Sequence, residues 1–188
     1  MINGRITEVA NAALDSSKEA VTLCIAMIGI MALWVGLMEI AKSSGLIRSI
    51  TGKIRPFMHF MFPEVPLEHP AMEYMTMNVI ANFLGLGWAA TPAGLKAMEG
   101  LSALQEDRRN GKLPGTVQQK GVASNEMCVF LILNISSLQL IPVNIIAYRS
   151  QYGSVNPTAI VGPAIAATTI STVAAIIFCK IMDRKRRV

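Results

Sequence analysis

Four apolar stretches, separated by polar segments, dominate the pattern along the chain. They cover residues 20–41, 74–95, 127–148 and 157–179, and Glu39 is the one charged residue within them. An α-helix needs about 20 apolar residues to cross the hydrocarbon core of a bilayer. The pattern therefore predicts an all-α, polytopic integral membrane protein with about four apolar helices.

Two of these stretches contain residues that interrupt helices. Residues 85–94 hold three glycines and Pro92, and Pro142 lies within the third stretch. Glycine weakens a helix because it is flexible, and proline lacks the amide hydrogen that the helix needs. The leading expectation is four simple crossings. The alternative is that the second or third stretch is broken or re-entrant and returns to the same face of the membrane.

The remaining segments divide the chain further. Residues 1–19 are polar and mildly amphipathic, residues 20–182 form the predicted membrane domain, and residues 183–188 form a basic tail. Between the first two stretches, apolar Leu46, Ile47, Ile50 and Ile54 repeat at helical spacing opposite Arg48, Lys53 and Arg55. This pattern predicts an amphipathic helix that lies either in the lipid headgroup plane or on the protein's own membrane face.

The charge distribution supports a membrane orientation. The chain has 17 basic and 12 acidic residues, and only 15% of its residues are charged. In a soluble chain the basic excess would suggest nucleic-acid binding, but here the tail at 184–187 is typical of a cytoplasmic anchor beside anionic lipids. The prediction is a multi-pass protein of the cell membrane with a cytoplasmic C-terminal tail and no nucleic-acid partner.

Uncharged polar residues inside the apolar stretches are the candidates for function, because each needs a partner at membrane depth. Asn78 and Asn82 share one helical face, and Gly85 extends that face. The third stretch carries Asn134, Ser136, Ser137, Gln139 and Asn144. Broken helices expose backbone groups that can serve a substrate, and amides suit a neutral polar solute or a loosely held ion. The alternative is that these groups only join helix to helix.

Other chemistry finds little support in the sequence. No nucleophile with a neighbouring base and no phosphate-binding loop is visible, so we predict no enzymatic activity, no catalytic residue and no cofactor. His69 and Glu73, with Glu64 and Glu68 nearby, could in principle approach a metal ion. An acidic helix start beside a connector histidine is the preferred interpretation, so no metal site is predicted.

Two segments of the chain resemble a known family. Residues 62–72 (FPEVPLEHPAM) and 82–99 (NFLGLGWAATPAGLKAME) are similar to spore maturation protein A, and residues 134–137, 140–142 and 157–163 add support. The resemblance covers roughly residues 20–182. It places the chain among the nucleoside recognition (Gate) domains.

The resemblance implies a function and further site residues. It implies a membrane component of a two-part spore maturation complex, acting with a sister protein, spore maturation protein B, in dehydration of the spore core. Transport or gating of a small solute or ion is the expected activity, and a non-transporting scaffold or regulator of spore envelope assembly is the alternative. By position, the resemblance adds Gly87 and Thr91 to the candidate substrate-binding residues.

Overall fold

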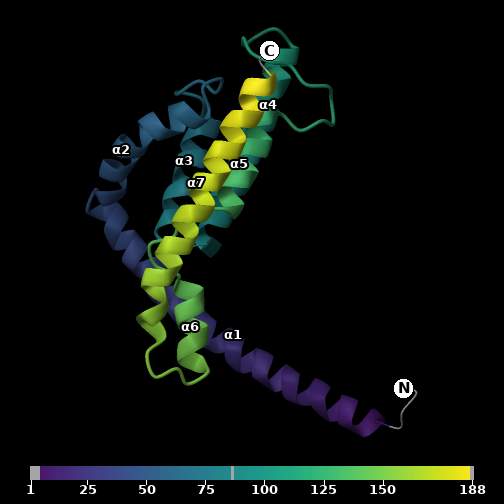
Figure 1. The fold of residues 1–188 in the computed structure, drawn as a ribbon, viewed down its shortest axis with the longest axis vertical. Coiled ribbons are helices and arrows are strands. Elements are labelled where there is room, and N and C mark those ends of the chain that lie inside the picture. The colour runs from purple at the N-terminus through teal and green to yellow at the C-terminus, as the bar shows by residue number, and fades with distance from the viewer. Residues whose placement is uncertain (1–4, 86, 187–188) are drawn as a thin grey trace. The chain divides into compact units, whose positions relative to one another are not determined.

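The computed structural model describes residues 5–85 and 87–186, and every regular element within those ranges is helical. The elements are α1 (Ile6–Ser43), α2 (Leu46–Met61), α3 (Pro70–Phe83), α4 (Gly87–Arg109), α5 (Asn125–Ile135), α6 (Val143–Gln151), the 3₁₀ helix η1 (Pro157–Ile160) and α7 (Val161–Arg186) (Figure 1). The prediction of an all-α fold is confirmed.

The chain divides into two compact units, residues 1–41 and 42–188. In the first unit, the predicted polar segment and the first apolar stretch form one continuous helix, α1. The hydroxyls of Ser17 and Thr22 donate hydrogen bonds to carbonyl oxygens four residues earlier. Both polar side chains are therefore satisfied by the helix that carries them.

The second unit is built around one hydrophobic core. α3 and α4 pack along each other, and α5 contacts α3, α4 and α7 (Figure 1). Large, fully buried side chains of this core come from four helices and the α2–α3 turn, and include Met58, Phe62, Met75, Leu101 and Phe130. Cys179 of α7 is also buried in it. Burial of these side chains supplies the main stabilisation of the unit.

Helix α2 is amphipathic, as the spacing predicts. Ile54 and Phe57 pack against the core, whereas Lys53 and Arg55 are exposed. The apolar face of this part of α2 therefore lies on the protein itself, which is one of the two expected positions. The side chains at 46–49, which contribute to the same prediction, lie outside the described part of the structure, as do the side chains of the basic residues 184–187.

The second and third apolar stretches are both broken. α3 ends at Phe83 and α4 begins at Gly87, while α5 ends at Ile135 and α6 begins after Pro142. With 14 and 11 residues, α3 and α5 are about 21 and 17 Å long, shorter than a bilayer core of about 30 Å. A single uninterrupted helix is therefore wrong for each of these two stretches. The breaks near Gly85 and before Pro142 are confirmed, whereas Pro92 and Gly94, also expected to interrupt the second stretch, lie inside the continuous helix α4.

The fourth stretch behaves differently. Within the described residues, one helical segment, Pro157–Asp183, is long and apolar enough to cross a membrane. It contains η1 and α7, and most of its apolar side chains, Ile170 and Ile177 among them, are exposed rather than packed in the protein.

Helix α3 begins with a histidine cap. His69 Nδ1 accepts a hydrogen bond from the Ala71 amide at 3.2 Å, and Pro70 occupies the first helical position, where no amide hydrogen is needed. Burial lowers the pKa of His69 below its ordinary value of 6.5, opposed by nearby Asp107 and assisted by Arg108. The neutral ring is the form that can accept this bond.

We expect this cap to make stability depend on pH. Because the folded-state pKa of His69 lies below the unfolded value, the unfolded chain binds more protons, and stability is lost as pH falls below about 6.5 through the folded pKa. His69→Asn keeps a capping acceptor that does not titrate, so the variant should lose this pH dependence of stability. Thermal unfolding of the full chain in detergent across this pH range measures it. An identical slope in the variant would contradict the assignment.

Candidate functional site

The two helix breaks meet each other in the second unit. The backbone amide of Leu140 donates a hydrogen bond to the carbonyl oxygen of Phe83 at 2.8 Å. Gly85 has φ +80°, and a β-carbon placed on it would lie 1.8 Å from the carbonyl oxygen of Ile141. Only glycine fits this left-handed conformation at such a close approach. We call residues 83–85 and 136–142 the break junction.

Three asparagine side chains form a hydrogen-bonded cluster beside the break junction. Asn82 Nδ2 donates to Asn78 Oδ1 at 3.2 Å and to Asn134 Oδ1 at 2.6 Å. Asn78 Nδ2 donates to the carbonyl oxygen of Ala90 in α4 at 2.9 Å. Asn78 and Asn82 are buried, and Asn134 is half-buried. This amide cluster therefore joins α3, α4 and α5 at one point.

The close packing of α4 on the amide cluster depends on Gly94. A β-carbon on Gly94 would lie 2.9 Å from Asn78 Nδ2 and 3.7 Å from Asn134 Nδ2. The absence of a side chain at this position lets the α4 backbone approach the amides. The glycine-rich run of the second stretch thus has two uses, the break at Gly85 and this contact at Gly94.

The amide cluster borders a cavity of about 320 Å³. Its walls come from α2, α3, α5, the break junction and α7, and are mainly apolar, with Asn78, Asn82, Asn134 and Ser137 and two α7 threonines as the polar members. Apolar lining residues include Phe57, Val79, Phe83, Leu133 and Ile176. An apolar pocket with a few convergent polar groups is the usual form of a small-molecule site.

The structure brings together only part of the predicted array. The backbone groups of Ser136 and Gln139 join the break junction to α7. The Ser136 carbonyl oxygen accepts from the Thr172 hydroxyl, and the Gln139 backbone N–H donates to Thr168 Oγ1 at 3.3 Å. Thr91 is exposed on α4 and donates to the carbonyl oxygen of Gly87 at 3.3 Å. The described residues that line the cavity do not include five of the predicted site residues: Gly87, Thr91, Ser136, Gln139 and Asn144.

Two further residues of the cavity are not among those predicted from the sequence. Thr169 and Thr172 of α7 also line the cavity. Their spacing of three places them on one face of the helix. Small hydroxyl residues at that spacing in the fourth stretch are the signal that could have identified them.

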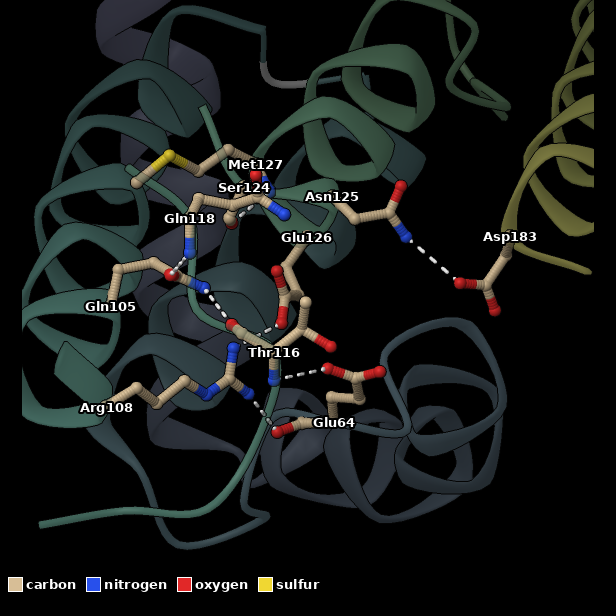
Figure 2. Close-up of polar contacts among 10 residues, drawn as sticks. All are labelled: Glu64, Gln105, Arg108, Thr116, Gln118, Ser124, Asn125, Glu126, Met127 and Asp183. Atoms are coloured by element: carbon tan, nitrogen blue, oxygen red, sulfur yellow. Dashed lines mark hydrogen bonds and ion pairs between the residues drawn. The ribbon is translucent and has the colours of Figure 1, made fainter. Parts of the chain in front are cut away.

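A second polar cluster lies where the α4–α5 connector packs against the α2–α3 turn (Figure 2). Arg108 is fully buried, and its Nη1 lies 2.6 Å from Glu126 Oε1 while its Nη2 donates to the Glu64 carbonyl oxygen at 2.6 Å. Gln105 bonds Thr116 and Gln118 of the connector at 3.2 Å each. The neighbouring cavity of about 290 Å³ is lined by residues of this cluster together with Asn125 and Asp183.

The buried ion pair stabilises the charged form of Glu126. Burial raises the pKa of Glu126, but the hydrogen bonds from Arg108, its own backbone amide and Ser124, with the positive charge of Arg108, outweigh burial and hold that pKa below its ordinary value. The pair joins α4 to α5 and to the α2–α3 turn. In the sequence, this region is one of the polar segments that separate the apolar stretches.

The metal site considered for His69 and Glu73 does not form in the described part of the chain. No three His, Cys, Asp or Glu side chains there converge as metal ligands. His69 instead caps α3 through Nδ1.

Comparisons with known proteins agree on one family. The family model described as nucleoside recognition (Gate) matches residues 24–182. Spore maturation protein A of Bacillus subtilis (strain 168) is 41% identical over 187 residues, which cover 100% of this chain and 89% of that protein. No solved structure matches the chain. The chain therefore belongs to the nucleoside recognition (Gate) family.

Proposed function

We propose that this protein is a multi-pass membrane protein of spore maturation that moves a small solute or ion through the cavity beside the break junction, or gates that movement. The similarity to spore maturation protein A over the whole chain supports the role in sporulation. The exposed apolar surface of α7 supports residence in the membrane. We further propose that the basic tail lies on the cytoplasmic side, following the distribution of basic residues.

The observation that carries the transport proposal is the amide cluster facing a cavity where two helices break. In a lipid environment, each polar group without an internal partner is costly. Structural joints between helices can be made by a single hydrogen bond, and they need no adjoining cavity. Three amides at a junction of broken helices, next to open space, resemble the way in which transporters bind substrates near the bilayer centre.

We propose that a second membrane protein completes the route. Transporters of this type pair two similar halves around the substrate. The described part of this chain holds one break junction, so the second would come from a partner similar to spore maturation protein B. Such a partner would also cover part of the apolar surface that α7 leaves exposed.

Asn82→Leu should abolish function while the protein still assembles. The change removes the two hydrogen bonds that Asn82 Nδ2 donates to Asn78 and Asn134, and it costs about 1–3 kcal/mol of stability through unpaired amides. The chain would be expressed in Bacillus subtilis cells that lack spore maturation protein A. Buoyant density of the spores reports core dehydration, and counts of heat-resistant spores report maturation. We expect the wild type to restore both and Asn82→Leu to restore neither.

Two further variants separate the route from the fold. Val79→Phe places a larger apolar side chain in the cavity and leaves all three asparagines in the sequence, so we expect it to block function as well. Asn144→Leu makes the same chemical change as Asn82→Leu outside the cavity and should restore function. Membrane fractionation of all three shows whether assembly is intact. Normal dense spores with Asn82→Leu and Val79→Phe would exclude a route through the cavity and favour the non-transporting scaffold.

A further inference from the structure

The direction of every hydrogen bond in the amide cluster is set by one backbone group. The Ala90 carbonyl oxygen can only accept, so the atom of Asn78 that faces it must be Nδ2. Asn78 Oδ1 then faces Asn82 and can only accept, so the facing atom of Asn82 must be the donor Nδ2. The same Nδ2 meets Asn134, whose facing atom must therefore be Oδ1. The three amide orientations follow from this chain of contacts and do not depend on a free choice of oxygen and nitrogen.

This orientation leaves one side-chain oxygen and one side-chain nitrogen of the cluster without any hydrogen bond. Asn78 uses both ends of its amide, and Asn82 uses Nδ2 twice. In the described part of the chain, no hydrogen bond reaches Asn82 Oδ1 or Asn134 Nδ2. Among those residues, Arg108 Nε is the one completely buried side-chain nitrogen or oxygen without a partner, so Asn82 Oδ1 and Asn134 Nδ2 are not completely buried. Both asparagines line the cavity.

The rest of the cavity wall restricts what can enter. The described residues that line it carry no charge, and most are aliphatic or aromatic. An ion that leaves water for this space would lose its hydration without gaining a counter-charge, and this loss is expensive. A neutral molecule with an apolar body would instead replace water against Phe57, Val79 and Leu133.

We infer that the cavity selects a neutral solute with a carboxamide-type edge, a carbonyl oxygen beside an N–H, carried on an apolar body, and that it rejects ions of either sign. The solute carbonyl accepts from Asn134 Nδ2, and the solute N–H donates to Asn82 Oδ1. The apolar body occupies the space between α2, α3 and α7. This inference rests on the proposed function of the cavity and names the class of solute.

A series of compounds of nearly equal shape tests the inference. Benzamide offers the donor and the acceptor, acetophenone only the acceptor, and benzoate and benzamidinium carry opposite charges. Binding to the full chain in a neutral detergent is measured by saturation-transfer NMR titration at mildly alkaline pH. We expect benzamide to bind roughly tenfold more tightly than either ion, and acetophenone to be weaker than benzamide by the loss of one hydrogen bond, roughly threefold to tenfold.

Asn134→Asp should reverse the preference. The substitution keeps the oxygen that accepts from Asn82 and replaces the free donor with a carboxylate oxygen of the same shape. We expect benzamidinium to bind this variant roughly tenfold more tightly than benzamide does, since it now meets two acceptors and a negative charge. Asn144→Leu, which lies outside the cavity, should show the wild-type order and corrects for partition of the compounds into micelles.

The outcomes separate the solute class from the proposed function. Equal binding of benzamide and either ion to the wild type, binding of none of the compounds, or an unchanged order in Asn134→Asp would overturn the inference. The spore assay with Asn82→Leu and Val79→Phe does not depend on the solute. If both variants lose spore maturation but the compounds do not bind in the expected order, only the inferred solute class is rejected. If benzamide binds selectively while spores with Asn82→Leu or Val79→Phe mature normally, the transport route is rejected and the binding site is retained.

Discussion

Gly85→Ala is expected to separate the two helix breaks and to lower the free energy of unfolding by more than about 3 kcal/mol. Gly85 combines a φ of +80° with a β-carbon position 1.8 Å from the carbonyl oxygen of Ile141. The left-handed conformation alone costs an alanine about 1–2 kcal/mol. The overlap adds to this cost, because backbone atoms on both sides must move and the bond between Leu140 and Phe83 stretches with them.

Two other glycines separate these contributions. Gly153 has φ +73°, but no neighbouring atom would obstruct a β-carbon at that position, so Gly153→Ala should show only the conformational cost. Gly87, at the start of α4, has neither a positive φ nor a close neighbour, so Gly87→Ala should be neutral or slightly stabilising. Thermal unfolding in one detergent ranks the three. A loss in Gly85→Ala no larger than that in Gly153→Ala would mean that the breaks are not locked together.

The positions of the helix breaks could be predicted from the sequence, because they follow from local chemistry. Gly85 and Pro142 both disfavour a helix locally. Local chemistry is not sufficient, however, because Pro92 and Gly94 lie inside the continuous helix α4. The contact between the breaks could not be predicted, since the Leu140 amide and the Phe83 carbonyl are distant in sequence. The pairing of Asn78 with Asn82 also follows from local geometry, because α3 is helical over both residues.

The same helical periodicity fails in the third stretch. Counting residues as though the helix continued places Asn134, Ser137 and Asn144 on one face. The chain is not helical between Ser136 and Pro142, so an offset of ten residues no longer defines a face. Asn134 and Ser137 precede or adjoin the break and reach the cavity, whereas Asn144 follows it in α6. Periodicity holds only as far as the helix does.

The role of Arg108 could not be predicted, for a different reason. In the sequence it stands beside Arg109 in a polar connector, and nothing local distinguishes the two. In the structure, the side chain of Arg108 is fully buried, whereas that of Arg109 is 23% exposed and pairs with Glu106 one turn away. Only the packing of α4 against α5 and the α2–α3 turn separates their roles.

Arg108→Met is therefore expected to destabilise the second unit by about 3–5 kcal/mol, because it leaves Glu126 as an uncompensated buried charge. The substitution also removes the donor to the Glu64 carbonyl oxygen, which positions the α2–α3 turn. Arg109→Met is the matched control, and loss of its partly exposed pair should cost less than about 1 kcal/mol. Chemical or thermal unfolding of the full chain in detergent measures both.

The double substitution Arg108→Met with Glu126→Met tests whether the cost comes from the stranded charge. Without the carboxylate, the remaining apolar pair should regain most of the loss, since replacing a buried ion pair by packed apolar side chains is often neutral. If the double variant were as unstable as Arg108→Met alone, the guanidinium bond to the Glu64 carbonyl, rather than the ion pair, would hold the turn. Because Arg109 Nε also donates to the connector at the Gln118 carbonyl oxygen, 3.0 Å away, a loss in Arg108→Met no larger than that in Arg109→Met would contradict a special role for the buried pair.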